Sequence, residues 1–242
     1  MQLIASGCSF TENVLVEDPW PNRLANKLGA KLTNLGAGGR GNEYIFNMAF
    51  DNLDKADLMV VMWSSFDRWD FVNNTFEIPY LLADGGTMPR RNELIDNTTG
   101  KPANLYLAEN KFVTASRALV NARCVDPRHQ IKKSLRWMVA LQDICKQKEV
   151  PLIMSMGFLH CTKLEDTEVA KTFTNFSRFF DLEGTIGWPY SYLLDGFTLH
   201  DKMRKHGTDM CISEFDEHPN ELGCELISEV YYDEYKKMYP KG

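Results

Sequence analysis

The sequence lacks several features that mark particular classes of protein. It contains no apolar run that approaches the roughly 18 residues of a membrane-spanning helix. Its first residues lack the basic and long apolar regions of a secretory signal peptide. Basic residues are not in excess, because 27 Lys and Arg stand against 33 Asp and Glu, for a net charge of −6. We therefore expect a cytoplasmic protein with no membrane span and no nucleic-acid partner.

Cysteine pairs are also missing. The six cysteines form no Cys-x-x-Cys motif, and a chain without a secretory signal rarely carries a disulfide framework. We expect most of them to be buried thiols, at positions 8, 124, 145, 161, 211 and 224. Stability must then come from an apolar core, for which 242 residues with 44% hydrophobic side chains supply enough material.

What is present is an alternation of short strand-like runs and helix-like periodicity. Strands are predicted at residues 2–5, 31–35, 58–63 and 151–156. Helices are predicted at residues 19–29, 42–53, 131–146 and 219–235. This alternation predicts a three-layer α/β/α sandwich with a flavodoxin-like parallel sheet of four or five strands.

One domain is predicted over residues 1–242, with loop insertions at about 64–130 and 158–210. The first insertion is compatible with a hairpin. In the last helix, Pro219 is predicted in the first turn. The same periodicity predicts a buried face, made of Leu222, Leu226, Ile227 and Val230.

Ligand sites of open parallel sheets lie beyond the carboxyl ends of the strands. Candidate segments follow three predicted strands, at 7–11, 34–42 and 63–68, and a fourth segment at 215–220 precedes the last helix. Ser9 stands in a tight turn, where its hydroxyl can attack an acyl carbonyl if an imidazole accepts the proton. His218 offers that imidazole. Gly39 allows a backbone N–H to approach a developing oxyanion.

The order and content of these four segments resemble the sequence blocks of the SGNH (GDSL-type) hydrolase superfamily. The resemblance implies that Ser9 is the nucleophile, Gly39 the oxyanion glycine and His218 the general base, with the amides of Ser9 and Gly39 binding the oxyanion. It also implies an esterase that works through an acyl-enzyme and needs no cofactor. Its substrate would be a small-molecule or glycan ester, with O-acyl groups on carbohydrate first and lipid acyl esters second.

Two features depart from the family pattern. The family most often places its acid three residues before the histidine, where this chain has Phe215. We therefore expect Asp216 to be the acid, with Glu214 and Glu217 as weaker candidates.

The third block also departs, because it lacks the asparagine that gives the family an oxyanion donor. Loss of one such donor costs roughly 10²–10³ in rate. Ser65, Asn42 and Ser64, in that order, are the candidate replacements, with a bound water as the fallback. Two other functions remain open on the same scaffold: an O-acyltransferase, or a non-catalytic binding or structural protein.

Several residues beside these segments are candidates for holding the substrate. Arg40 and Arg68 border the predicted site and suit an anionic group, although an ion pair of Arg68 with Asp67 or Asp70 is an equally good interpretation. Trp63 and Ser64 also lie at the end of the third strand. An aromatic face such as that of Trp63 packs well on a sugar ring or an aryl group.

Three competing motifs are weaker. The run Gly36–Gly41 satisfies G-x-G-x-x-G, but it follows the second strand and no acidic residue ends the next one, which disfavours a dinucleotide. Cys8 is better explained as a buried residue than as a thiol nucleophile. His200, Asp201 and His206 match no metal-binding spacing, so we predict no metal.

Overall fold

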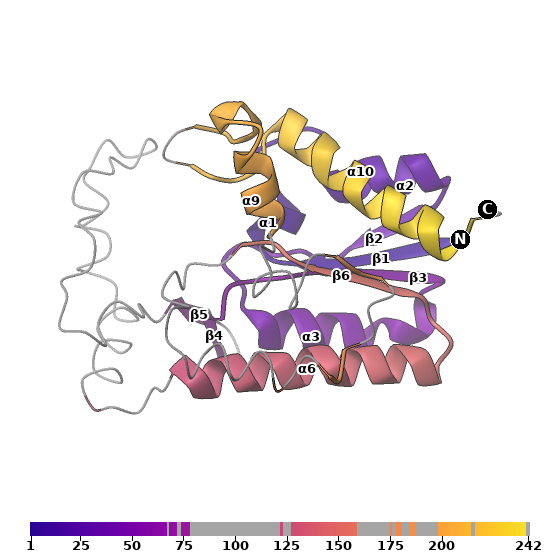
Figure 1. Cartoon of the computed structure of the whole chain (residues 1–242), viewed down its shortest axis with the longest axis vertical. Coiled ribbons are helices and arrows are strands. Elements are labelled where there is room, and N and C mark those ends of the chain that lie inside the picture. Colours follow the sequence, from indigo (N-terminus) through magenta and orange to yellow (C-terminus); the bar gives the residue numbers. More distant parts are fainter. Residues whose placement is uncertain are drawn as a thin grey trace.

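The structure is a computed structural model that describes residues 1–66, 68–71, 74–77, 122, 127–158, 175, 178–180, 184–186, 198–213 and 216–240. A five-stranded sheet with the order β2-β1-β3-β6-β7 forms its centre (Figure 1). Its strands are β1 (Gln2–Gly7), β2 (Lys31–Asn34), β3 (Leu58–Trp63), β6 (Leu152–Met156) and β7 (Thr185–Ile186). Every pairing within it is parallel. All six side chains of β3 are buried, as its unbroken apolar run requires.

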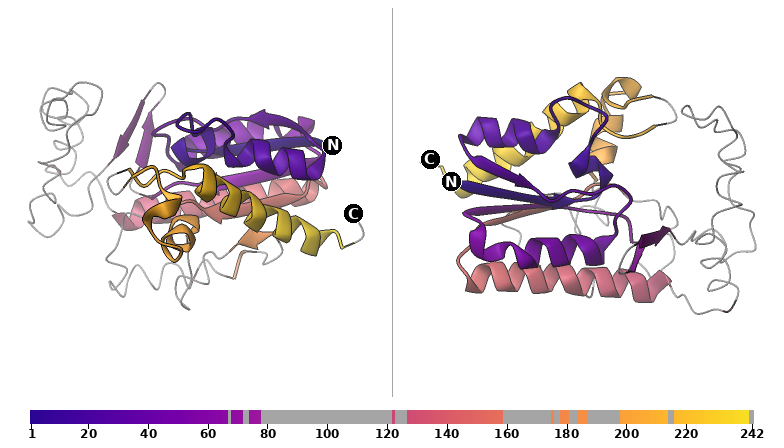
Figure 2. Two further views of the ribbon diagram at one scale, coloured as in Figure 1. Left: turned by 90° about the horizontal axis from the view of Figure 1, so that it is seen from above. Right: turned by 180° about the vertical axis from the view of Figure 1, so that it is seen from behind.

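Helices cover both faces of this sheet (Figures 1 and 2). One face carries α2 (Trp20–Leu28) and α10 (Glu221–Met238), and the other carries α3 (Asn42–Asp51) and α6 (Pro127–Gln147). The predicted three-layer α/β/α sandwich is therefore confirmed.

The helices α2 and α10 are joined by packing and by charge. The rings of Trp20 and Tyr231 lie 4.6 Å apart between them, and both side chains are fully buried. Lys27 pairs with Glu225 at 2.8 Å, and this hydrogen bond is the main cause of the lowered pKa of Glu225. These contacts matter for the site because α2 follows the Ser9 turn and α10 follows His218.

Smaller elements gather at the carboxyl edge of the sheet. They are α1 (Ser9–Glu12), α9 (Leu199–Arg204), the 3₁₀ turn η3 (Thr208–Met210) and an antiparallel hairpin of β4 (Arg68–Phe71) and β5 (Asn74–Glu77). A further 3₁₀ turn, η1 (Leu53–Lys55), follows α3. Figure 2 shows the hairpin standing at the same end of the molecule as α1.

Parts of the predicted insertions are regular structure. The hairpin lies in the first predicted insertion, and α6 begins at Pro127 instead of Ile131. The second insertion was predicted to be irregular, yet it contains β7 and α9. The remaining parts of both insertions lie outside the described residues.

The predicted start of the last helix is wrong by two residues. Asn220 caps α10, because its side-chain oxygen accepts from the backbone N–H groups of Leu222 and Gly223, so the helix begins at Glu221 and Pro219 precedes it. Gly223 faces inward, where a Cβ would overlap the carbonyl oxygen of Met210. Leu222 is turned outward and is 60% exposed, which corrects its predicted place on the buried face.

The described cysteines are free thiols buried in the protein: Cys8, Cys145, Cys211 and Cys224. Burial raises the pKa of Cys145 to about 12 and that of Cys224 to about 11. Cys124 and Cys161 lie outside the described residues. Of the helices that the structure describes, none has the length and apolar character to cross a membrane.

Candidate active site

Three side chains form a hydrogen-bonded line at the carboxyl edge of the sheet. Nε2 of His218 lies 2.8 Å from Oγ of Ser9, and its Nδ1 lies 2.5 Å from Oδ1 of Asp216. Ser9 and His218 are 209 residues apart in the sequence. The structure therefore brings together the three residues that the sequence motifs predict as nucleophile, base and acid.

The position of Ser9 follows from the tight turn at the end of β1. Cys8 is extended and precedes α1, whose amides of Thr11 and Glu12 donate to the carbonyl oxygen of Cys8. Gly7 permits this turn because a Cβ at that position would overlap the Thr11 side chain. As a result, Ser9 is the first residue of α1 and is half-buried at the edge of the sheet.

The acid reaches His218 from only two residues away because the loop folds back on itself. Oδ1 of Asp216 accepts from the backbone N–H of His218 at 3.1 Å as well as facing its ring. This is an Asx-type turn, in which a side chain bonds the backbone two residues on. Ser213 supports the turn, since its Oγ accepts from the Asp216 amide at 3.0 Å. The departure from three-residue spacing is thereby explained.

The hydrogen bonds define the proton positions on the imidazole. A carboxylate accepts only, so the Nδ1 of His218 that faces Asp216 must carry a proton. In the neutral imidazole, Nε2 is then the acceptor for the hydroxyl of Ser9. The side chains of His218 and Asp216 are 34% and 40% exposed, so a substrate can approach this line from solvent.

Aromatic rings form the wall beside the imidazole. The ring of Phe10 lies 5.1 Å from that of His218 and 4.9 Å from that of Phe158. Sequence reasoning missed both phenylalanines, as well as Ser213. The signal for Phe10 was its place next to Ser9, whereas nothing in the sequence joins Phe158 to this site.

The alternative acids and nucleophile lie elsewhere. Glu217 points to α9, where its carboxylate pairs with Arg204 and lies 3.4 Å from Nε2 of His200. Glu214 lies outside the described residues. Cys8 has no exposed surface, and within the described residues its thiol makes no hydrogen bond to His218.

The glycine-rich segment after β2 lies against the Ser9 turn. The amide of Ala37 donates to the carbonyl oxygen of Gly7 at 3.2 Å, and a Cβ on Gly36 would overlap the backbone nitrogen of Glu12. Gly39 has a φ of +70° and is exposed, with open space where a Cβ would stand. The conformation, not crowding, is what requires glycine there.

The residues proposed to replace the missing asparagine are buried. Oδ1 of Asn42 accepts from the Ser64 amide at 2.8 Å, while its Nδ2 donates to the Ser64 carbonyl at 3.0 Å and to Ser134 at 3.2 Å. Both amide hydrogens of Asn42 are therefore used, which corrects its expected role as an oxyanion donor. The side chains of Ser64 and Ser65 are also buried.

The residues expected to contact a substrate divide into fully buried and half-buried ones. Trp63 is fully buried, as is Ser64, so the expectation that they face a substrate is corrected: they belong to the core. Arg68 donates to the carbonyl oxygen of Arg40 at 3.2 Å, and its guanidinium lies 4.7 Å from the ring centroid of Phe158. Arg40 lies over the ring of Tyr44.

The start of α3, where a dinucleotide phosphate would bind, is taken by a carboxylate. Asp70 accepts from the amides of Gly41 at 2.8 Å and Tyr44 at 2.9 Å. A negative side chain at a helix N-terminus occupies the anion position. Gly41 allows the hairpin to approach, because a Cβ would come within 2.7 Å of Asp70. Asp67, the other predicted partner of Arg68, lies outside the described residues.

The three loosely spaced metal candidates do not converge. The carboxylate of Asp201 accepts from the amide of Thr198 in a capping box at the start of α9. His200 faces Glu217 and the ring of Phe10. Among the described residues no group of three or more potential ligands gathers.

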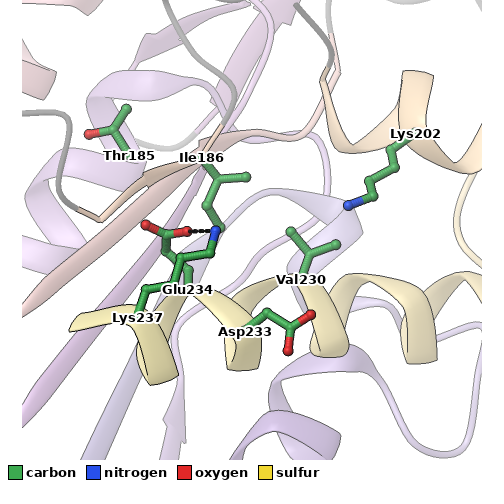
Figure 3. Close-up of a pocket in the computed structure, with 7 residues that line it drawn as sticks. All are labelled: Thr185, Ile186, Lys202, Val230, Asp233, Glu234 and Lys237. Carbon is green, nitrogen blue, oxygen red and sulfur yellow. Dashed lines mark hydrogen bonds and ion pairs between the residues drawn. The ribbon is translucent and has the colours of Figure 1, made fainter. Parts of the chain in front are cut away.

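A separate pocket of about 640 Å³ lies between β7, α9 and α10 (Figure 3). Figure 3 shows Lys202 of α9 across from Val230 and Asp233 of α10, with Lys237 paired to Glu234. Burial is the main cause of the lowered pKa of Lys202. None of the described residues that line this pocket belongs to the Ser9 site. Their formal charges cancel, because two lysines stand against two acidic residues.

Comparison with known proteins gives similarity in structure alone. No protein-family model matches the chain, and no curated protein sequence matches it. Among solved structures, the chain is similar to an acetyl xylan esterase, with 14% identity, a TM-score of 0.48, and coverage of 96% of this chain and 98% of the other.

The chain is also similar to two solved structures of bacterial lipolytic proteins. A member of the lipolytic protein G-D-S-L family from Veillonella parvula shares 12% identity, with a TM-score of 0.44 and full coverage of both chains. The lipase/acylhydrolase from Enterococcus faecalis shares 12% identity, with a TM-score of 0.46 and coverage of 100% of this chain and 98% of the other.

Proposed function

We propose that this protein is a serine hydrolase that cleaves carboxylic esters through an acyl-enzyme. The observation that carries the proposal is the imidazole of His218, which lies 2.8 Å from Oγ of Ser9 and 2.5 Å from Oδ1 of Asp216. A hydroxyl, a base that can accept its proton and an acid that orients the base are the parts that nucleophilic acyl transfer requires.

In the acylation step, Oγ of Ser9 bonds to the acyl carbon while its proton passes to Nε2 of His218. The carbonyl oxygen takes the electron pair and becomes an oxyanion. When the carbonyl re-forms, the bond to the alcohol oxygen breaks and His218 gives its proton to that oxygen. Asp216 holds the imidazole and stabilises its positive charge in the interval.

Deacylation repeats these events with water. His218 takes a proton from water, whose oxygen attacks the acyl carbon, and the carboxylic acid leaves as Oγ of Ser9 recovers its proton. If an alcohol replaced water in this step, the same residues would perform acyl transfer. Product analysis distinguishes the two reactions.

The oxyanion requires preorganised donors. We assign this role to the backbone amides of Ser9 and Gly39. Ser9 is the first residue of α1, where an amide has no acceptor within the helix. Gly39 belongs to the segment that bonds Gly7 next to this turn. With Asn42 committed to Ser64, a third donor would have to be Ser65, Ser64 or water, and the buried state of both serines favours water.

The proposed substrate is a small-molecule or glycan ester. Arg68 and Arg40 are the candidates for contacts with it, because Arg68 stacks on Phe158, whose ring packs on Phe10 beside Ser9. O-acyl groups on carbohydrate are the first choice, and lipid acyl esters the second.

A fluorophosphonate probe tests the proposal directly, because it reacts only with an activated serine. We expect the wild-type protein to be labelled on Ser9, and the Ser9→Ala variant to lose labelling together with at least about 10³-fold of the activity on chromogenic esters. His218→Ala serves as the second arm, since it keeps the hydroxyl and removes its base.

An unlabelled wild-type protein, or Ser9→Ala protein with full turnover, would overturn the proposal and favour a non-catalytic scaffold. Activity that survives in Ser9→Ala and disappears on further change of Cys8 would assign the reaction to the thiol. A series of chromogenic esters with increasing acyl length then orders the substrates.

A further inference from the structure

The distance between Ser9 and His218 depends on contacts between separate elements. Ser9 belongs to α1 and His218 to the loop before α10, and 209 residues separate them. Hydrolysis requires Nε2 of His218 to stay aligned with Oγ of Ser9, since a misplacement of about 1 Å can cost roughly 10² in rate. The packing of Phe10 on the ring of His218 joins the short helix to the loop, and a hydrogen-bonded connection accompanies it.

Asn13 makes this connection. It ends α1, where its backbone amide donates to the carbonyl oxygen of Ser9 at 2.9 Å. Its side-chain Nδ2 donates to the carbonyl oxygen of Pro219 at 2.8 Å and lies 3.1 Å from Sγ of Cys224. Pro219 is the residue directly after His218. One buried residue is thus hydrogen-bonded to the backbone carbonyl of Ser9 on one side and to that of Pro219, the neighbour of His218, on the other.

The chemistry of this position suits asparagine. Its φ is +37°, in the left-handed region that asparagine tolerates better than most residues. Pro219 offers only a carbonyl oxygen, so the side-chain atom that faces it must be the NH₂ group of the amide. Glycine would keep the backbone conformation without the donor. Aspartate would keep the shape and place an acceptor against an acceptor.

Stability alone does not explain the choice. Oδ1 of Asn13 is buried and has no hydrogen-bond partner within the described part of the chain. A buried acceptor without a protein partner is unfavourable, so the side-chain oxygen does not account for an asparagine at this position. The part of the Asn13 side chain that matters is therefore the Nδ2 donor, which bonds the carbonyl oxygen of Pro219.

We propose that Asn13 is a positioning residue that holds the His218 loop at bonding distance from Ser9. It touches no substrate and acts through the carbonyl of Pro219. This inference rests on the proposed function, because it assigns Asn13 a part in the same reaction.

The test compares Asn13→Gly with a matched control, Asn52→Gly. Asn52 also follows the end of a helix, α3, and its Nδ2 donates to the carbonyl of Met48 at 2.9 Å, but it contacts no residue of the site. Labelling by the fluorophosphonate probe is measured against probe concentration. We expect Asn13→Gly to lower the maximal labelling rate by about 10- to 100-fold with the half-saturating concentration unchanged. Asn52→Gly should label as the wild type does.

A second readout does not depend on catalysis. The ¹⁵N chemical shift of Nε2 of His218 reports its hydrogen bond to Ser9, and we expect Asn13→Gly to move it toward the value in Ser9→Ala. If Asn13→Gly does not fold, Asn13→Asp, which keeps the size and the backbone tolerance, replaces it in both measurements.

The outcomes separate the two hypotheses. A maximal labelling rate and an Nε2 shift that both equal those of the wild type would overturn the role of Asn13, even with a lower melting temperature. A wild-type protein that is not labelled on Ser9 would overturn the proposed function. In that case the Nε2 shift alone decides whether Asn13 holds the loop.

Discussion

Polar residues follow both β1 and β3, which are neighbours in the sheet, but their surroundings differ. After β1, Ser9 is half-buried and bonds to His218, which is 34% exposed. After β3, Ser64 is fully buried and bonds through its backbone to Asn42, which is 1% exposed. Ser9 and His218 bond to each other and are open to solvent. Asn42 is buried and bonds to the backbone of Ser64.

This difference shows which polar residues at a sheet edge are available for chemistry. A buried amide whose donors and acceptor are all bonded holds chain segments together, since breaking those bonds leaves buried groups without partners. A half-exposed imidazole between a hydroxyl and a carboxylate has its reactive nitrogen within reach of a substrate. Mutations after β1 should therefore lower activity, whereas mutations after β3 should lower stability.

The largest contrast is expected between two neighbouring acids. Asp216→Ala should lower kcat by about 10³–10⁴-fold, because the imidazole loses the group that orients it. Glu217→Ala should change kcat by less than about tenfold, since its carboxylate pairs with Arg204 instead. Steady-state kinetics on one chromogenic ester measures both. A costlier loss at Glu217 would mean that the acid has been assigned to the wrong residue.

A smaller effect on activity is expected at the glycine-rich segment. Gly39→Ala should lower kcat by about 10- to 10²-fold, because a side chain at φ +70° shifts the backbone that carries the proposed oxyanion amide. Gly29→Ala is the matched control, with a φ of +59°, the same open space and a position at the end of α2. Both variants should lose similar stability in urea titrations, and equal kcat values would remove Gly39 from the oxyanion hole.

At the end of β3 the expected effect is on folding. Asn42→Ala should lower the free energy of unfolding by about 1–3 kcal/mol, because it leaves the backbone groups of Ser64 without their partner. The kcat of the folded protein should stay within about threefold of the wild type. Urea titration and kinetics on the same preparation check this. A large fall in kcat at unchanged stability would restore Asn42 as an oxyanion donor.

The smallest effect is expected for Ser64→Ala. Oγ of Ser64 is buried and has no hydrogen-bond partner within the described ranges, so its removal breaks no hydrogen bond among those residues. We expect a change of stability within about 1 kcal/mol and unchanged kcat. Thermal unfolding and initial rates are the measurements. A fall in kcat with constant KM would show that this hydroxyl serves the oxyanion.

The sequence predicted what depends on local pattern. The strands β1, β3 and β6 were readable from short apolar runs, and the chain segments that follow β1 and precede α10 carried Ser9, Asp216 and His218. By contrast, β7 has only two residues and shows no periodicity. The helix α9 did leave a signal, because Thr198 and Asp201 have the spacing of a capping box.

The misplaced residues depended on partners distant in the sequence. Asn42 stands at the start of a helix, a position from which its side chain was expected to donate to the oxyanion. Its hydrogen bonds to Ser64, 22 residues away in the sequence, hold that side chain in the core instead. Leu222 fitted the helical period, but the cap at Asn220 and the contact of Gly223 with Met210 turned it outward. Trp63 was expected to face a substrate because it ends a strand, but it belongs to the unbroken apolar run of β3, whose six side chains are all buried.

The order of the strands has a consequence for how this fold varies. The chain leaves β1 toward α2 on one face of the sheet and leaves β3 toward α6 on the other, so the connections that leave these neighbouring strands diverge (Figure 1). In open parallel sheets, such a divergence gives a ligand crevice through connectivity, independent of which side chains line it. Segments that leave after β3 can therefore lengthen or shorten as one wall of the crevice without displacing the turn that presents Ser9. New specificities could then arise by loop exchange around a Ser9 turn that stays in place.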